Sequence, residues 1–258
     1  LRPDREISPA TLDRVVSTTD GIPLFAEELG RTLIDADQAA GAASPAGRDI
    51  PATLETSLMA RLDQHAGARR VAQRAAVIGR EFDQPMLEEV AELEPDELRQ
   101  GLERLVADDL LVRRGDGPRV RYAFRHVLIQ DAAYASLLKR KRRELHALTA
   151  QALERQLSRD PAGAPLEAIA RHHESAEQFD RAALLYRDAA DLAMQQSAHP
   201  EARAHLERSI TVLRRLADEP RWQELEAELH SGLASAVIAS NGYGDGAIGD
   251  AYRRAHEL

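Results

Sequence analysis

The sequence contains no cysteine among its 258 residues. This absence excludes disulfides, thiol nucleophiles, iron–sulfur clusters and cysteine-based zinc sites. Aromatic residues make up only 4 % of the chain, and no apolar run reaches the roughly 18 residues of a membrane-spanning helix. The start of the chain shows no secretory signal segment. These absences disfavour a β-rich fold and a membrane protein, and they make a cytoplasmic location the expectation.

Alanine and leucine are the residues in excess, with 45 and 33 copies, which is 78 of 258 residues. Both are strong helix formers, so we expect a mainly α-helical fold. The chain begins with Leu1 instead of methionine and stops at Leu258 within a helical pattern. We therefore interpret the sequence as a piece of a longer protein.

The formal net charge of −9 is unevenly distributed. Residues 110–146 carry ten basic and three acidic side chains, a balance of +7, which leaves −16 for the remainder. This basic region is either a contact surface or a solvated face paired with acidic groups of the same chain. The candidate contact residues are Arg119, Arg121, Arg125, Lys139, Arg140, Lys141, Arg142 and Arg143.

The first two-thirds of the chain predict two groups of helices. Start signals and apolar stripes indicate helices within 8–63, around a loop at 38–50. Helices at about 67–79, 84–92 and 95–108 come next, followed by a β-hairpin of Leu110–Arg114 and Val120–Phe124. Three helices followed by a two-stranded wing is the order of a winged-helix domain. Further helices are expected at about 126–138 and 140–157.

A break at 160–165 precedes a repetitive region. Helices are predicted at about 166–178, 181–197, 200–216, 221–240 and 246–258. Small and large residues alternate at fixed spacing in three of these segments, for example Ala182, Tyr186 and Ala189. This spacing resembles the second helix of a tetratricopeptide (TPR) repeat and predicts a TPR-like α-solenoid.

No enzyme motif is complete in the sequence. It has no phosphate-binding Gly-x-x-x-x-Gly-Lys-Ser/Thr loop, no Gly-x-Gly-x-x-Gly and no Gly-x-Ser-x-Gly. We interpret the adjacent His172 and His173 as packing residues and Gly242–Gly246 as a turn between helices. No catalytic residue and no metal ligand is predicted.

Two stretches resemble a known family. Thr18–Leu29 is similar to the segment that follows the nucleotide-binding core of STAND ATPases (signal-transduction ATPases with numerous domains). Gly21 and Pro23 match a Gly-x-Pro motif whose proline packs on adenine in that family. Tyr122–Tyr134 resembles the end of the family's winged helix, and His126 matches a histidine that contacts the β-phosphate of ADP. The alternative for His126 is a helix-capping or core histidine.

The resemblance covers nearly the whole chain and implies its organisation. Residues 1–65 would be a helical lid subdomain, 66–158 a winged-helix domain with connecting helices, and 159–258 truncated TPR-like repeats. The nucleotide-binding core would lie upstream, so the chain alone holds no cofactor, whereas its parent protein would bind ADP or ATP with magnesium. The parent would be an ATPase fused to an adenylate/guanylate cyclase domain or a LuxR-type DNA-binding domain.

The resemblance implies a regulatory and sensor segment in signal transduction. Its partners would be the upstream nucleotide-binding domain and a protein or small-molecule ligand on the solenoid, with no membrane. A winged-helix transcriptional regulator that binds DNA is a second hypothesis. Direct DNA binding is disfavoured because acidic side chains outnumber Arg99 and Arg104 on helix 95–108. A third hypothesis is a plain protein-interaction adaptor.

Overall fold

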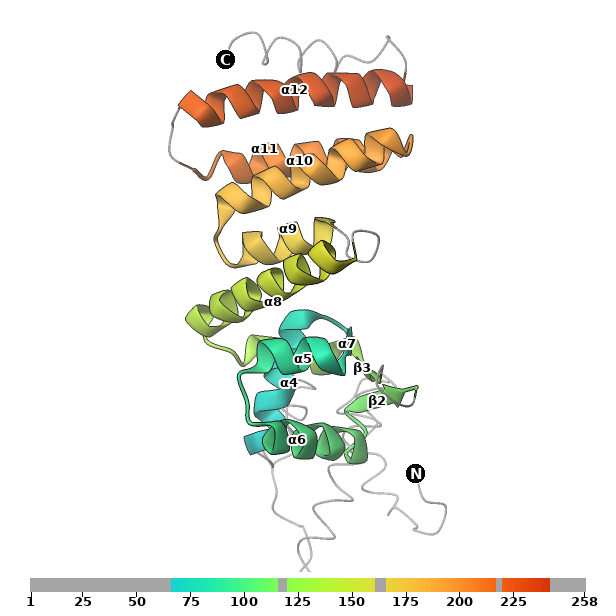
Figure 1. Ribbon diagram of the computed structural model, residues 1–258, viewed down its shortest axis with the longest axis vertical. Coiled ribbons are helices and arrows are strands. Elements are labelled where there is room, and N and C mark those ends of the chain that lie inside the picture. Colours follow the sequence, from blue (N-terminus) through green and yellow to red (C-terminus); the bar gives the residue numbers. More distant parts are fainter. Residues whose placement is uncertain (1–65, 116–119, 161–165, 217–219, 242–258) are drawn as a thin grey trace, which may run out of the picture. The chain divides into compact units, whose positions relative to one another are not determined.

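The computed structural model describes residues 66–115, 120–160, 166–216 and 220–241 (Figure 1). Three predicted features lie outside the described residues: the lid with Gly21 and Pro23, the basic residue Arg119, and the helix at 246–258. The fold is mainly α-helical, as predicted. The described elements are α4 (Ala66–Ile78), β1 (Glu81–Asp83), α5 (Gln84–Ala91), α6 (Pro95–Ala107), β2 (Leu111–Arg114), β3 (Arg121–Phe124), α7 (Val127–Ala135), α8 (Lys139–Arg159), α9 (Leu166–Ser175), α10 (Phe179–Gln195), α11 (His199–Leu213) and α12 (Pro220–Asn241).

The chain divides into two compact units between Leu137 and Leu138. In the first unit, β2 and β3 pair antiparallel as the predicted hairpin, with Leu111 opposite Phe124. β1 pairs with the other edge of β3, which makes a three-stranded sheet in the order β1-β3-β2. The order of the elements is helix, short strand, two helices and a final hairpin. This is the order found in a winged helix.

Apolar residues of the sheet face the helices of the first unit. Phe82 stacks on Tyr122 with ring centroids 5.8 Å apart, and Phe124 lies 6.1 Å from Phe82. These rings join buried leucines and alanines of α4, α5 and α6 in one core. Asp83 starts α5 by accepting a hydrogen bond from the Met86 backbone N–H at 2.9 Å. The sheet and α5 are therefore positioned by the same short strand.

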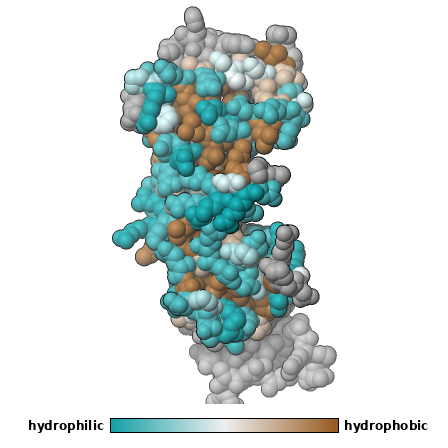
Figure 2. Space-filling model, viewed as in Figure 1, coloured by the Kyte–Doolittle hydropathy of each residue, from teal (hydrophilic) through white to brown (hydrophobic). Residues whose placement is uncertain are grey.

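The second unit is a stack of helices in which each packs on the next, from α9 to α12, with α8 on α9 (Figure 1). The predicted small–large–small sets are buried on α10 and α11, where Ala182, Tyr186 and Ala189 correspond to Ala202, Leu206 and Ser209. Small residues allow the two helices to approach closely. At this contact the Ser209 hydroxyl of α11 donates a hydrogen bond to the Ala183 carbonyl of α10 at 2.8 Å. On the face drawn in Figure 2, hydrophilic side chains surround the smaller apolar areas.

Two successive turns of this stack have the same geometry, 20 residues apart. Glu177 and Ser197 both adopt left-handed backbone conformations, with φ of 61° and 60°. In each turn the residue after the left-handed one donates its backbone N–H to a carbonyl of the preceding helix. Gln178 donates to His173, and Ala198 donates to Ala193, both at 2.9 Å. This is the bonding of a helix C-terminal motif that usually ends in glycine.

We expect Ser197→Gly to stabilise the protein by about 1 kcal/mol, because glycine adopts this conformation without a Cβ clash. Ser197 is exposed, so the substitution removes no buried contact. Urea unfolding of wild type and variant measures the difference. Ser197→Val is the opposite control, and an unchanged midpoint in both variants would contradict the role assigned to this turn.

Candidate functional site

The start of α7 is the described part of the predicted nucleotide site. His126 is the residue before the helix, with extended backbone angles of φ −130° and ψ 144°. Its carbonyl accepts the first helical bond, from the Ile129 N–H at 3.1 Å. Its side chain makes no capping hydrogen bond and is half-buried. The His126 imidazole therefore does not cap the helix, and the helix-capping alternative is wrong.

The position of His126 is fixed from both sides. Before it, the Arg125 N–H donates to the Leu110 carbonyl at 3.1 Å, and the Arg125 guanidinium pairs with Asp109. After it, Ile129 is fully buried, and the Gln130 side-chain amide donates to the Ala76 carbonyl of α4 at 3.1 Å. The histidine is thus held where β3 passes into α7 by the core of the winged helix.

The surroundings of His126 suit contact with another group. The first turn of α7 contains no acidic residue, while Val127 and Leu128 are 49 % and 40 % exposed. A helix N-terminus carries a partial positive charge, and an imidazole N–H there can donate to an anion. The arrangement can therefore hold an anionic group beside an apolar one.

The candidate basic residues are largely paired with carboxylates of the chain. Arg114 and Arg121 lie opposite one another in the sheet, and both contact Glu81, at 3.0 and 3.9 Å. Arg125 pairs with Asp109. Glu81 and Asp109 thus neutralise part of the wing, in agreement with the interpretation of a face paired within the chain.

Cations at the start of α8 also pair with carboxylates of the chain. Lys139 and Arg143 share Glu177, with Lys139 at 3.7 Å, and Lys141 lies 3.0 Å from Glu144. Arg140 is exposed. Glu177 and Glu144 thus pair with at least three of the five cations from Lys139 to Arg143.

The two histidines interpreted as packing residues are indeed buried, but they belong to polar networks. His172 on α9 faces His146 on α8 with the Nδ1 atoms 2.9 Å apart. Burial lowers the pKa of His146 to about 4 and that of His172 to about 3, so both rings are neutral near pH 7. One ring then donates and the other accepts. His146 was not singled out from the sequence, because its partner lies on another helix.

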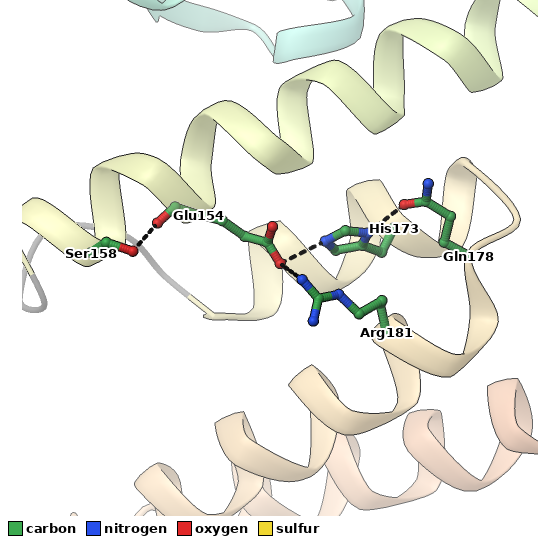
Figure 3. Close-up of polar contacts among 5 residues, drawn as sticks. All are labelled: Glu154, Ser158, His173, Gln178 and Arg181. Atoms are coloured by element: carbon green, nitrogen blue, oxygen red, sulfur yellow. Dashed lines mark hydrogen bonds and ion pairs between the residues drawn. The ribbon is translucent and has the colours of Figure 1, made fainter.

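The second network joins α8, α9 and α10 (Figure 3). His173 contacts Glu154 through Nε2 at 3.1 Å and Gln178 through Nδ1 at 2.6 Å. Arg181 donates to the same Glu154 oxygen at 3.2 Å. Because the four side chains come from α8, the end of α9 and the start of α10, their contacts fix how these helices are aligned with one another.

A third network continues along the stack. Tyr186 donates to Glu174 at 3.1 Å, and Arg208 donates to both carboxylate oxygens of Glu174, at 2.9 and 2.5 Å. Burial, followed by the charge of Glu174, raises the pKa of Tyr186 to about 12. These are structural contacts between helices. Within the described ranges, no group of three or more acidic or histidine side chains could hold a metal ion.

No protein-family model matches the chain. The chain is 27 % identical over 238 residues to an uncharacterized protein of Rhizobium meliloti, a match that covers 91 % of the chain but only 23 % of that protein. The chain thus spans less than a quarter of this relative. None of the helices in the described part of the chain has both the length and the apolar character needed to cross a membrane.

Proposed function

We propose that the chain is the regulatory and sensor segment of a STAND-type ATPase signalling protein. It would couple the ADP or ATP state of an upstream nucleotide-binding core to ligand or partner binding by the helical stack. The observation that carries the proposal is His126, which the winged-helix core holds half-buried at the start of α7 without a capping bond. A relative much longer than the chain fits a segment of a multidomain protein.

The mechanism follows from the residues that would meet the nucleotide. His126 would donate an N–H to a phosphate oxygen, aided by the helix dipole. Pro23, outside the described residues, would cover the adenine, and Gly21 would let the backbone turn beneath it. These contacts would stabilise a closed, ADP-bound state, and a ligand of the stack that binds the open state better would shift the population towards that open state.

Isothermal titration of ADP into a longer protein that joins this chain to its upstream core tests the proposal. We expect His126→Ala to weaken ADP binding by about tenfold or more, since a hydrogen bond to a charged group contributes roughly 1.5–3 kcal/mol. Pro23→Ala should also weaken ADP binding, because it removes the apolar ring that would cover the adenine. His205→Ala on α11 is the matched control. Unchanged ADP affinity and unchanged activation in both variants would refute the nucleotide roles.

DNA binding by the winged helix is disfavoured by the pairing on α6. Arg99 contacts Asp96 and Glu103 at 3.3 and 3.2 Å, and Arg104 contacts Asp108 at 3.0 Å. The cations of the helix that would enter the groove are therefore engaged by its own carboxylates. Fluorescence anisotropy with duplex DNA at low salt should show no tight binding; tight, salt-sensitive binding would favour the transcriptional-regulator hypothesis instead.

A further inference from the structure

We infer that the outward face of α10, together with α12, is a docking surface for a cationic amphipathic helix of a partner protein. The exposed Leu192 would meet the apolar side of that helix, and nearby carboxylates would meet its lysines or arginines. The inference names the kind of partner that the helical stack would bind, and in that respect it rests on the proposed function. All of its evidence lies within the second unit.

The apolar part of this surface is a stripe along α10. Leu184, Asp188 and Leu192 follow one another at intervals of four residues, so they lie on one side of the helix. Leu192 is 45 % exposed, and Leu184 is partly buried against the core of the stack. Figure 2 shows apolar areas between hydrophilic side chains on the side of the stack where α10 lies in front of α11 (Figure 1). Leu192 thus offers apolar area that a partner can bury.

The carboxylates beside this stripe come from two helices. Arg187 donates to Asp188 at 2.8 and 3.1 Å. This hydrogen bond, and then the charges of Asp188, Glu228 and Asp191, raise the pKa of the guanidinium above its ordinary value of 12.5. Arg187 therefore lies near carboxylates of both α10 and α12. All three acidic residues are exposed, and three carboxylates against one cation leave this part of the surface negative.

The negative charge is concentrated on α10 and α12. These two helices together contain six carboxylates and three cations, whereas α11 contains two of each. The cations of α11 are paired, Arg203 with Glu207 at 2.8 Å and Arg208 with Glu174 of α9 at 2.5 Å. The face of α10 and α12 therefore attracts a cationic segment, whereas α11 has no excess charge of either sign.

A cationic amphipathic helix fits these features better than the other occupants do. It presents lysine or arginine beside an apolar stripe, which is how a helix docks against a partly apolar surface. A second copy of the chain meets repulsion, because each copy carries a net charge of −9. Duplex DNA and anionic membranes are themselves negative, so the carboxylates of this surface repel them.

Fluorescence anisotropy with the full 258-residue chain and a labelled model peptide tests the inference. The probe is a helical peptide of leucine and lysine whose leucines share one face. We expect saturable binding at about 20 mM salt that weakens by about tenfold or more at about 0.5 M salt, because exposed charges are screened. A peptide with glutamate in place of lysine should not bind. No nucleotide is present, so a failure here leaves the proposed contact of His126 with ADP standing.

Two variants of the surface should weaken binding of the lysine peptide. Asp191→Lys/Glu228→Lys reverses two charges and should raise the Kd by about tenfold or more. Leu192→Ala removes the apolar contact and should raise the Kd by about fivefold or more. Because all three side chains are exposed, the variants should keep the circular dichroism spectrum of the wild type.

Two matched variants are the controls. Glu167→Lys/Glu207→Lys makes the same change in net charge on α9 and α11, and Leu138→Ala removes a leucine that is 80 % exposed at the start of α8. Both should bind the peptide like wild type. Absence of binding by wild type, equal losses in surface variants and controls, or binding of the glutamate peptide overturns the inference. So does a loss confined to the charge variant with Leu192→Ala unchanged, since the surface would then take cations without an apolar side. Self-association in sedimentation velocity that disappears in the charge variant would assign the surface to a second copy instead.

Discussion

Lowering the pH from 7 to 5 should destabilise the helical stack by about 2 kcal/mol for each of His146 and His172. Both pKa values lie below the ordinary value of 6.5, at about 4 and about 3, chiefly because the rings are buried. Below pH 6.5 the unfolded chain therefore binds protons that the folded chain does not. The stabilisation is complete above pH 6.5 and falls as the pH drops towards 4. Urea unfolding at a series of pH values, followed by circular dichroism, measures it.

The double variant His146→Phe/His172→Phe separates this pair from other titrating groups. Two apolar rings of similar size replace a neutral, buried, hydrogen-bonded pair, so stability at pH 7 should change little. The slope of stability between pH 6.5 and 5 should become shallower by up to about 2.7 kcal/mol per pH unit, twice the value for one group. A double variant with the wild-type slope would show that these histidines are not the groups that titrate.

Gly101→Ala should destabilise the winged-helix unit by about 2–3 kcal/mol, because α6 packs closely on α4 at this glycine. An added Cβ would lie 2.5 Å from Val71 Cγ2, 3.2 Å from Val71 Cβ and 3.4 Å from the Gly67 carbonyl oxygen. Val71 is fully buried, so it cannot move aside without disturbing the core. Thermal or urea unfolding reports the loss.

Two variants on α4 control this prediction. Gly67→Ala meets nothing within 4 Å, so it should stabilise by roughly 0.5–1 kcal/mol through helix propensity. Val71→Ala removes the obstructing methyl groups, and Gly101→Ala should cost less in that background than in wild type. Equal costs in both backgrounds would show that the contact with Val71 is not the cause.

The helices and the hairpin could be predicted because their signals are local. Apolar periodicity and start residues placed α5 at 84–92 and α6 at 95–108, within one residue of the observed ends. β1 was missed because three residues are too few to show alternation. Its partner also lies far along the chain: Glu81 pairs with Ala123 of β3. The structure extends the predicted two-stranded wing to three strands for this reason.

The candidate site was only partly predictable. The sequence placed His126 at a helix start, which is where it lies, and it showed the excess of cations in residues 110–146. It could not show that Arg114 meets Glu81, 33 residues away, or that Arg143 meets Glu177, 34 residues away. The His146–His172 pair was invisible for the same reason. Side-chain pairs between separate elements depend on packing, and single-chain periodicity does not report it.

Hydrogen–deuterium exchange with and without ADP tests the central claim most directly. The measurement uses the longer protein that joins this chain to its upstream core. If His126 meets the nucleotide, ADP should slow exchange at the amides of Val127, Leu128 and Ile129 in the first turn of α7, because a closed state buries them. Exchange in the buried middle of α10 serves as the reference that should not change. Unaltered exchange at the start of α7, in a protein whose core amides become protected by ADP, would contradict the account.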